Sequence, residues 1–420
     1  MDAEAKGPEH LKAASLIAVG ISALVIAFAA ALIIAPGSPP DAASVTSSRF
    51  FDQAAIERAG DYRSQVRLLG IGAILIQFIL LSILAFNRGS TIKRLLGRLE
   101  RRPYPGAALA GAGIALAVGL AQLPFAYLTF EQGREFGLVT QQLGGWFGDR
   151  AALTGIACLL AAAGALLAML LWRKLGRRFW IAGSVLVATW AVVVVWLWPV
   201  VVTPLFNDFE PLPEGGTRSE VLSLAARAGV GVREVYEVDA SRRSSALNAY
   251  VNGIGPTKRV VLYDNSIDQL SDAELSALIA HELGHVAADD LYRGLGFAIL
   301  VIPLAVLFVQ ISTAALVRRR GDDPNGPGVI PALALTIALA TLVLGVPGNL
   351  LSRKIEIKAD QYALELTGRA VGMVGLQSKL ARSNLSDPDP PGIYQFVFGT
   401  HPTTLERLAL AERFRREEGS

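Results

Sequence analysis

The sequence predicts a mainly α-helical protein that crosses a membrane seven times and carries a small α+β domain outside the bilayer. The chain has 420 residues, of which 52% are hydrophobic and 18% are charged. Average soluble domains carry about 25% charged residues. The composition therefore excludes an ordinary soluble enzyme. The only cysteine, Cys158, lies in an apolar run, which excludes a disulfide framework and a cysteine metal site.

The apolar residues are concentrated in seven runs without a charged side chain. Each run has roughly 19 to 25 residues, long enough to cross a bilayer as a helix. The runs are Ala13–Ala35, Leu68–Phe86, Ala107–Phe130, Ala151–Trp172, Phe179–Val202, Gly294–Val317 and Val329–Leu351. The first is longer than the apolar part of a signal peptide and no clear cleavage site follows it, so we expect it to be retained.

Basic residues concentrate in the loops on one side of the predicted membrane. These loops follow the second, fourth and sixth runs and contain Arg88, Lys93, Arg94, Arg98, Arg101 and Arg102, then Arg173, Lys174, Arg177 and Arg178, then Arg318, Arg319 and Arg320. The positive-inside rule places them in the cytoplasm and residues 207–293 outside. The basic residues form no groove-like stripe, so we expect membrane lipid around the chain and no nucleic-acid partner.

An H-E-x-x-H pattern, His281-Glu282-Leu283-Gly284-His285, lies on a helix that a capping box at Ser271 and Glu274 begins. Residues four apart share one face of a helix, so His281 and His285 can bind one Zn²⁺ ion. Glu282 then lies beside the open coordination position as the general base. The chain has only four histidines, so a chance match is rare. The pattern predicts a zincin-like peptidase domain that acts on a peptide or protein.

A third protein ligand is needed, and no third histidine follows at the spacing of the extended pattern. Glu356 and Asp360 stand four apart on a later helix, so Glu356 can bind the metal while Asp360 accepts a hydrogen bond from a zinc histidine or helps proton transfer. Two spans separate His285 from Glu356, which brings both helices to one membrane face. The alternative is a solvated acidic face. Asp289 and Asp290 follow on the histidine helix, and we expect them to cap or orient.

Besides a short helix from Thr217 to about Ala228, which a capping box begins, the rest of the soluble part predicts a small sheet and three helices. Strands are expected at Glu234–Val238, Leu247–Asn252 and Arg259–Tyr263. An edge strand of such a sheet can hold an extended peptide by main-chain hydrogen bonds. Helices are expected at 352–365, at about 371–382 and from about 403. We divide the chain into residues 1–203 with five spans, 204–293 with the H-E-x-x-H helix, 294–351 with two spans, and 352–420 with the third ligand.

The sequence resembles the type I CAAX prenyl proteases, a family of seven-span integral-membrane zinc metalloproteases. The similar segments are Phe130–Gly137, Pro204–Gly215, Ser244–Tyr250, His281–His285, Ser352–Asp360 and His401–Arg407. The resemblance implies a gluzincin site with His281, His285 and Glu356 as metal ligands, Glu282 as base and Asp360 as a further catalytic-site carboxylate. It also implies that the seven helices enclose a water-filled chamber with the zinc at one end.

The resemblance further implies that Asn248, on the edge strand, and His401 contact the substrate or the developing oxyanion. Their ordinary alternatives are a polar strand or turn residue and a loop residue before a helix. The family's eukaryotic members present the zinc site to the cytosol, whereas the loop charges place it outside, so both orientations stay open. Arg407 is expected to hold the last helix through a salt bridge.

These observations predict an integral-membrane zinc endopeptidase that hydrolyses peptide bonds with an activated water. CAAX prenyl proteases cleave near the C-terminus of prenylated proteins, so the substrate here is expected to be a peptide or protein, with or without a lipid modification. The Ala-, Val-, Gly- and Arg-rich composition suggests a bacterial cell membrane. One alternative is a quality-control metalloprotease of the heat-shock type. Another is a non-catalytic membrane chaperone or transporter, which the absence of charges within the spans disfavours.

Overall fold

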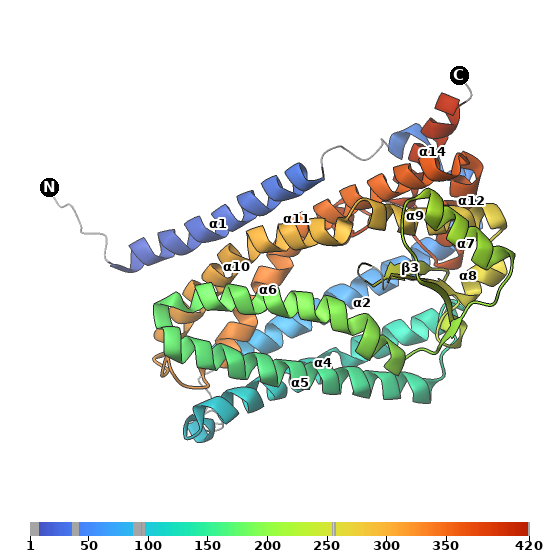
Figure 1. The fold of residues 1–420 in the computed structure, drawn as a ribbon. Coiled ribbons are helices and arrows are strands. Elements are labelled where there is room, and N and C mark those ends of the chain that lie inside the picture. The colour runs from blue at the N-terminus through green and yellow to red at the C-terminus, as the bar shows by residue number, and fades with distance from the viewer. Residues whose placement is uncertain are drawn as a thin grey trace.

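Long helices that run side by side dominate the fold, and a small sheet with shorter helices gathers at one end (Figure 1). The computed structural model describes residues 8–35, 42–86, 94, 97–253, 255 and 258–418. The long helices are α1 (Pro8–Ile34), α2 (Gln53–Phe86), α4 (Pro103–Glu135), α5 (Leu143–Leu175), α6 (Phe179–Leu197), α10 (Asp290–Arg320) and α11 (Val329–Thr367).

The seven predicted spans fall on these helices, although the first ends one residue beyond α1 and the fifth continues past α6 into a π-helical turn at Trp198–Val202. Among the described residues, six segments are long and apolar enough to cross a membrane. One of them, 143–194, contains both α5 and α6, which meet at a turn where Gly176 has a φ of 48°. This positive φ favours glycine and lets the chain reverse direction between the two helices. The prediction of a polytopic helical membrane protein is confirmed.

The contacts between the membrane helices run in a ring, which a further contact between α4 and α11 crosses. In ring order, α2, α4, α5, α6, α10 and α11 each contact the next, α11 contacts α2, and α1 packs outside against α10 and α11. Small residues allow close approach, as membrane helices require. A Cβ added at Gly111 of α4 would lie 2.5 Å from the carbonyl oxygen of Ala161 in α5. The ring is an arrangement able to surround the predicted chamber, which stays a prediction.

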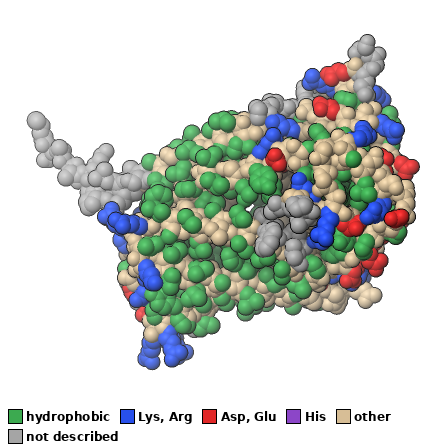
Figure 2. All heavy atoms as spheres, viewed as in Figure 1, with side chains coloured by type: hydrophobic (Ala, Val, Ile, Leu, Met, Phe, Trp, Pro, Cys, Tyr) green, Lys and Arg blue, Asp and Glu red, His purple; other side chains and the backbone are tan. Residues whose placement is uncertain are grey.

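Apolar side chains cover the ring in a broad band, and charged side chains lie beyond it (Figure 2). The end away from the sheet is predominantly basic, whereas acidic and basic side chains mix at the other end. Arg88 and Lys93 of the predicted basic loops lie outside the described residues. The pattern is that of a protein embedded in a bilayer. The orientation inferred from the loop charges stays a prediction.

The sheet has four strands in the order β1-β2-β4-β3. They are β1 (Phe209–Pro211), β2 (Glu234–Val238), β3 (Ala249–Asn252) and β4 (Arg259–Tyr263). Strands β2 and β4 are parallel, and β3 pairs antiparallel with β4, with Ala249 opposite Leu262. Strand β3 therefore lies at an edge, and one side of its main chain is not paired within the sheet. The three predicted strands form, although β3 begins two residues later than expected.

Helices cover the sheet and join it to the membrane helices. They are α7 (Gly216–Arg227), α8 (Asp264–Gln269), α9 (Asp272–Ala287), α12 (Ala370–Ser383), α13 (Gly392–Phe398) and α14 (Thr404–Glu418). One core contains Leu262 of β4, Ile279 and Leu283 of α9, and Leu364 of α11, each fully buried. Burying such a side chain stabilises a fold by about 1.5–3 kcal/mol. This core fixes α9 against the end of α11.

Two helix boundaries differ from the sequence expectation. The helix predicted at 352–365 is the continuation of α11, which passes from the predicted span into the soluble part without a break. Asp289 and Asp290 do not share the histidine helix: α9 ends at Ala287, Asp289 has a left-handed φ of 55°, and α10 begins at Asp290. Asparagine and aspartate tolerate this conformation better than other side chains, which allows the chain to turn here.

Candidate metal centre

Helix α9 presents the two histidines of the H-E-x-x-H pattern one turn apart. Its start is fixed by the predicted capping box, in which the main-chain N–H of Ser271 donates to Glu274 Oε2 at 2.9 Å. Gly284, between the histidines, lets α11 approach closely. A Cβ at this position would lie 3.2 Å from Tyr362 Cδ1 and 3.3 Å from Ala359 Cα. The glycine thus allows α11 to bring Glu356 to the histidines.

The three predicted ligands come together at this crossing. His281 Nε2 lies 3.2 Å from His285 Nε2 and 3.3 Å from Glu356 Oε2, and His285 Nε2 lies 3.6 Å from Glu356 Oε1. Ligand atoms of a tetrahedral zinc site at bond lengths near 2.0–2.1 Å are about 3.3 Å apart. Glu356 Oε2 is buried and has no hydrogen-bond partner, which a metal ion would provide. The residues therefore fit a zinc ion.

The other ring nitrogen of each histidine contacts a carboxylate. His281 Nδ1 lies 2.9 Å from Asp360 Oδ1, and His285 Nδ1 lies 3.0 Å from Asp290 Oδ2. An Nδ1–H that donates to a carboxylate leaves Nε2 as the free lone pair and fixes the ring orientation. Asp290 thus has the orienting contact expected for it, although it comes from α10. Asp360 accepts a hydrogen bond from a predicted zinc histidine, which is one of its two expected roles.

Arg407 of α14 balances the buried charge of Asp360. Its Nε donates to Asp360 Oδ2 at 2.7 Å, and its Nη2 lies 3.4 Å from His281 Nδ1. The side chain of Asp360 is 1% exposed and that of Arg407 is 13% exposed. A buried carboxylate without a partner would be costly, so this salt bridge ties α14 to the centre of the site. The salt bridge expected for Arg407 is present.

The pKa values of Glu282 and His281 differ from the ordinary values of these side chains. Burial raises the pKa of Glu282 above its ordinary value, against the opposing effect of His281 and His285. A raised carboxylate pKa suits a general base that works near neutral pH. Burial disfavours a charge on His281, but interactions with Asp360 and Glu356 outweigh it and raise its pKa to about 10. A metal ion must therefore displace a proton from this ring.

His401 lies at the open side of the ligand cluster. Its Nε2 is 3.6 Å from Glu356 Oε1, and its side chain is 63% exposed. Desolvation, together with the charge of Arg407, lowers its pKa below the ordinary value despite the nearby Glu356. The ring is therefore neutral at pH 7 and able to donate a hydrogen bond. This location is compatible with the substrate contact that the resemblance implies.

The loop that carries His401 is held by α11 through residues that the sequence analysis did not single out. Arg353 Nη1 donates to the carbonyl oxygens of Gln395, at 3.1 Å, and Gly399. Asn349 Nδ2 donates to the carbonyl oxygen of Val397 at 2.7 Å. Arg353 is buried in the structure. Arg353 lies three residues before Glu356, and no sequence pattern around it predicts this contact.

Asn248 precedes the edge strand, which packs against α9. Its main chain is fixed by Ser266, whose Oγ accepts from the Asn248 N–H and donates to the Asn248 carbonyl oxygen, both at 2.8 Å. The residue is exposed. Among the described residues, the side-chain amide of Asn248 makes no hydrogen bond, so it can contact a peptide along β3; its role stays a prediction.

Comparison with known proteins agrees with this arrangement. A family model for peptidase family M48 matches residues 211–414, and one described as the CAAX prenyl protease N-terminal region with five membrane helices matches residues 39–208. A metalloprotease of Bacillus subtilis (strain 168), YhfN, is 30% identical over 306 residues, which cover 71% of this chain and 72% of that protein.

More distant similarities extend to eukaryotes. A CAAX prenyl protease 1 homolog of Oryza sativa subsp. japonica is 34% identical over 231 residues, about half of each chain (53% of both). The crystal structure of S. mikatae Ste24p has the same fold, with a TM-score of 0.78 and 21% identity over 96% of this chain and 98% of that one. The chain therefore belongs to peptidase family M48, as a multi-pass membrane metalloprotease with the N-terminal helices of the CAAX prenyl proteases.

Proposed function

We propose that this protein is a zinc endopeptidase in which His281, His285 and Glu356 hold one Zn²⁺ ion. The observation that carries the proposal is the convergence of the three side chains: the two Nε2 atoms lie 3.2 Å apart, each lies 3.3–3.6 Å from one of the Glu356 oxygens, and one ligand atom from each residue lies within 4.8 Å of the others. Glu356 Oε2 supports it, because this buried oxygen accepts no hydrogen bond from the described residues. Asp360 and Asp290 keep the two imidazoles in the tautomer and orientation that metal binding requires.

Zinc, when bound, lowers the pKa of water towards about 7 and polarises the scissile carbonyl. Glu282 accepts the proton of the attacking water and passes it to the leaving amine, a task for which its raised pKa suits it. His401, neutral at pH 7, donates a hydrogen bond to the oxyanion from the open side of the site. One such donor typically contributes about 10²–10³ in rate.

The peptide lies in extended form along the unpaired edge of β3. Main-chain hydrogen bonds to this edge give affinity without demanding one sequence, and the Asn248 side chain adds a contact at the start of the strand. Because several relatives are named as CAAX prenyl proteases, we propose a peptide or protein substrate that carries a lipid group near its C-terminus. Such a group would reside in the bilayer, and the unbroken run of α11 from its predicted membrane span to Glu356 supports a site close to it.

The first test compares Glu282→Gln with the wild-type protein, both purified in detergent. The variant keeps the three ligands, so we expect zinc content to be unchanged and cleavage of a prenylated C-terminal peptide to be lost. Turnover by Glu282→Gln at the wild-type rate would refute Glu282 as the base. A chelator-treated sample, reactivated by zinc, serves as the control.

A second comparison addresses the lipid group. The same peptide with and without the prenyl chain is offered to the wild-type enzyme, and we expect a higher kcat/KM for the prenylated form. Equal values would favour the quality-control alternative, in which an extended main chain alone is recognised. The match of residues 39–208 to the five-helix N-terminal region favours the first outcome, since heat-shock-type enzymes usually have fewer spans.

A further inference from the structure

The residues between β2 and β3 connect the edge strand to the membrane helices. We call residues 240–248 the connecting segment. It leaves the sheet after β2, passes the loop between α4 and α5, and enters β3 at Ala249. Its last residue is Asn248. Any contact that fixes this segment therefore also fixes the start of the strand along which the peptide is proposed to bind.

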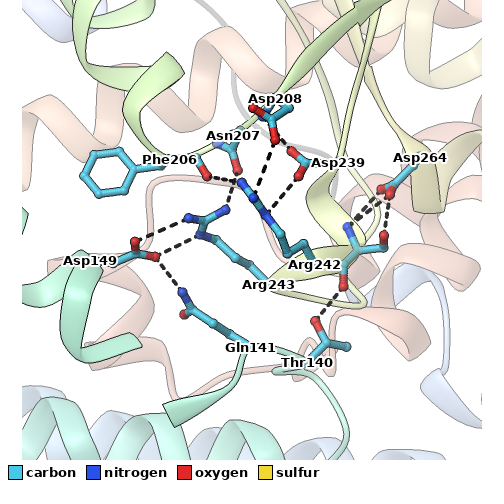
Figure 3. Close-up of polar contacts among 11 residues, drawn as sticks. Thr140, Gln141, Asp149, Phe206, Asn207, Asp208, Asp239, Arg242, Arg243 and Asp264 are labelled. Carbon is cyan, nitrogen blue, oxygen red and sulfur yellow. Dashed lines mark hydrogen bonds and ion pairs between the residues drawn. The ribbon is translucent and has the colours of Figure 1, made fainter. Parts of the chain in front are cut away.

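The α4–α5 loop pairs with the connecting segment as a short strand would. Val139 and Ser244 form an isolated antiparallel bridge. Around it, the Thr140 N–H donates to the Arg243 carbonyl oxygen at 3.2 Å, and the Ser245 N–H donates to the Leu138 carbonyl oxygen at 3.0 Å. The Thr140 hydroxyl adds a bond of 2.7 Å to the Ser241 carbonyl oxygen (Figure 3). The α4–α5 loop is thus hydrogen-bonded to the connecting segment shortly before β3.

Arg243 reinforces this junction with an ion pair to α5. Its Nε and Nη2 lie 2.9 Å and 3.3 Å from the two oxygens of Asp149, and its Nη1 donates to Asn207 Oδ1 at 3.4 Å (Figure 3). Gln141 Nε2 also donates to Asp149, at 2.6 Å. The side chains of Arg243 and Asp149 are only 24% and 26% exposed. A two-bond contact of this kind fixes direction as well as distance, unlike an exposed ion pair.

The far end of the connecting segment is held by Asn384, the residue after α12, which α2 contacts in turn. The Leu247 N–H donates to Asn384 Oδ1 at 2.9 Å, and Asn384 Nδ2 donates back to the Leu247 carbonyl oxygen at 3.1 Å. The carbonyl oxygen of Asn384 in turn accepts from Arg63 Nη2 of α2 at 2.6 Å. The main chain next to Asn248 is therefore tied to α2 on one side, while Arg243 ties the segment to α5 on the other.

We propose that Arg243 is a substrate-positioning residue: through Asp149 it sets the place of β3 and Asn248 relative to the metal centre, so that the membrane helices control peptide binding. The proposal rests on the proposed function in that β3 is taken to hold the substrate. The metal ligands are positioned by the separate contact of α9 with α11. Loss of the ion pair should therefore displace the edge strand and leave the metal ligands in place.

The test compares Arg243→Gln with Arg242→Gln, a matched control at the next residue. Arg242 is 50% exposed and contacts Asp239 at 2.9 Å, Asp208 at 3.5 Å and the carbonyl oxygen of Phe206 at 2.8 Å (Figure 3), without a contact to α5 among its described partners. For Arg243→Gln we expect KM for an extended peptide to rise about tenfold, equivalent to about 1.4 kcal/mol, with kcat and zinc content nearly unchanged. Arg242→Gln should stay within about twofold of wild type.

A reversal of the pair separates positioning from general damage. Asp149→Asn should reproduce the rise in KM, and Asp149→Arg combined with Arg243→Asp should lower KM towards the wild-type value. A double-mutant cycle of Arg243→Gln, Asp149→Asn and the variant that combines these two substitutions gives the coupling between the two sites. An equal loss of kcat, zinc and thermal stability in Arg242→Gln and Arg243→Gln would overturn the proposal, because that result describes a fold defect. An unchanged KM in Arg243→Gln would also overturn it.

Hydrogen exchange gives a readout that does not require activity. We expect the main-chain amides of residues 249–252 to exchange faster in Arg243→Gln than in Arg242→Gln or the wild-type protein, while those of α9 stay protected. Equal exchange in all three proteins refutes the positioning role. If the wild-type protein cleaves no peptide, the proposed function fails, but this comparison still decides whether Arg243 holds the edge strand.

Discussion

Replacing Asp360 with asparagine tests how the buried charges support the metal centre. The substitution keeps the shape of the side chain and an oxygen for His281 Nδ1, 2.9 Å away, but removes the charge. Removing a carboxylate that orients a metal-bound histidine typically weakens metal binding 10–100-fold, or about 1.4–2.7 kcal/mol. It also leaves Arg407 buried without its anion, which costs about 3–5 kcal/mol in comparable pairs.

The surroundings of Arg407 set where in this range the cost falls. Gln377, once its amide is turned, accepts from Arg407 Nη2 at 3.1 Å and offers partial compensation, so we expect the lower end, about 3 kcal/mol. The matched control is Asp290→Asn, because Asp290 orients His285 but its own arginine, Arg293, is 34% exposed and remains hydrated. The control should weaken zinc binding with little loss of stability.

Zinc affinity is measured by competition with a chromogenic chelator, and stability by thermal melting in detergent. We expect Asp360→Asn to lower both, and Asp360→Asn combined with Arg407→Met to recover stability but not zinc affinity. If Asp360→Asn binds zinc as tightly as the wild-type protein and melts at the same temperature, the buried ion pair has no role in either property, and the argument from burial is wrong.

Three further predictions concern the helix crossing, the proton and the membrane side. Gly284→Ala should weaken zinc binding by separating α9 from α11, because the added Cβ would lie 3.2–3.3 Å from Tyr362 and Ala359. We expect this effect to exceed the gain of about 1 kcal/mol in helix propensity that alanine brings. Unchanged zinc affinity in chelator competition would contradict this prediction. Zinc affinity should fall as pH falls, by up to about tenfold per pH unit, because His281, whose pKa is raised to about 10, must lose its proton when zinc binds. Calorimetry in two buffers with different ionisation enthalpies measures this proton release, and a value of zero would contradict the prediction. If the loop charges set the orientation, a phosphatase that works only outside the cytoplasm should be active when fused to the C-terminus of this chain. Activity of a reporter that works only in the cytoplasm, fused at the same place, would show the opposite orientation.

The proximity of the two histidines among the proposed metal ligands was predictable because their spacing is local. The capping box at Ser271 and the apolar stripe of α9 define a helix, and a helix fixes which face His281 and His285 share. The pairing with Glu356 needed one further argument, that an even number of spans returns the chain to the same membrane face. Helical periodicity and parity suffice for such a site, since neither depends on how the side chains pack.

The supporting contacts were not predictable because they join distant segments. Nothing near Arg243 indicates that Asp149, on a membrane helix 94 residues earlier, will be its partner. The order of the strands, which puts β3 at the edge, depends on pairing across α7 and on β1, which has only three residues. The break at Asp289 depends on the competition between extending α9 and starting α10. Tertiary packing determines each of these features, and a local sequence pattern does not predict tertiary packing.

Zinc content of the Glu356→Gln variant, compared with that of the wild-type protein purified in parallel, tests the central claim most directly. Glutamine fills the same space but is a weak zinc ligand, so the comparison isolates the carboxylate that α11 delivers. We predict a single zinc ion per wild-type chain and a large loss in the variant. Full zinc occupancy in Glu356→Gln, or a wild-type protein that binds no zinc, would contradict the account.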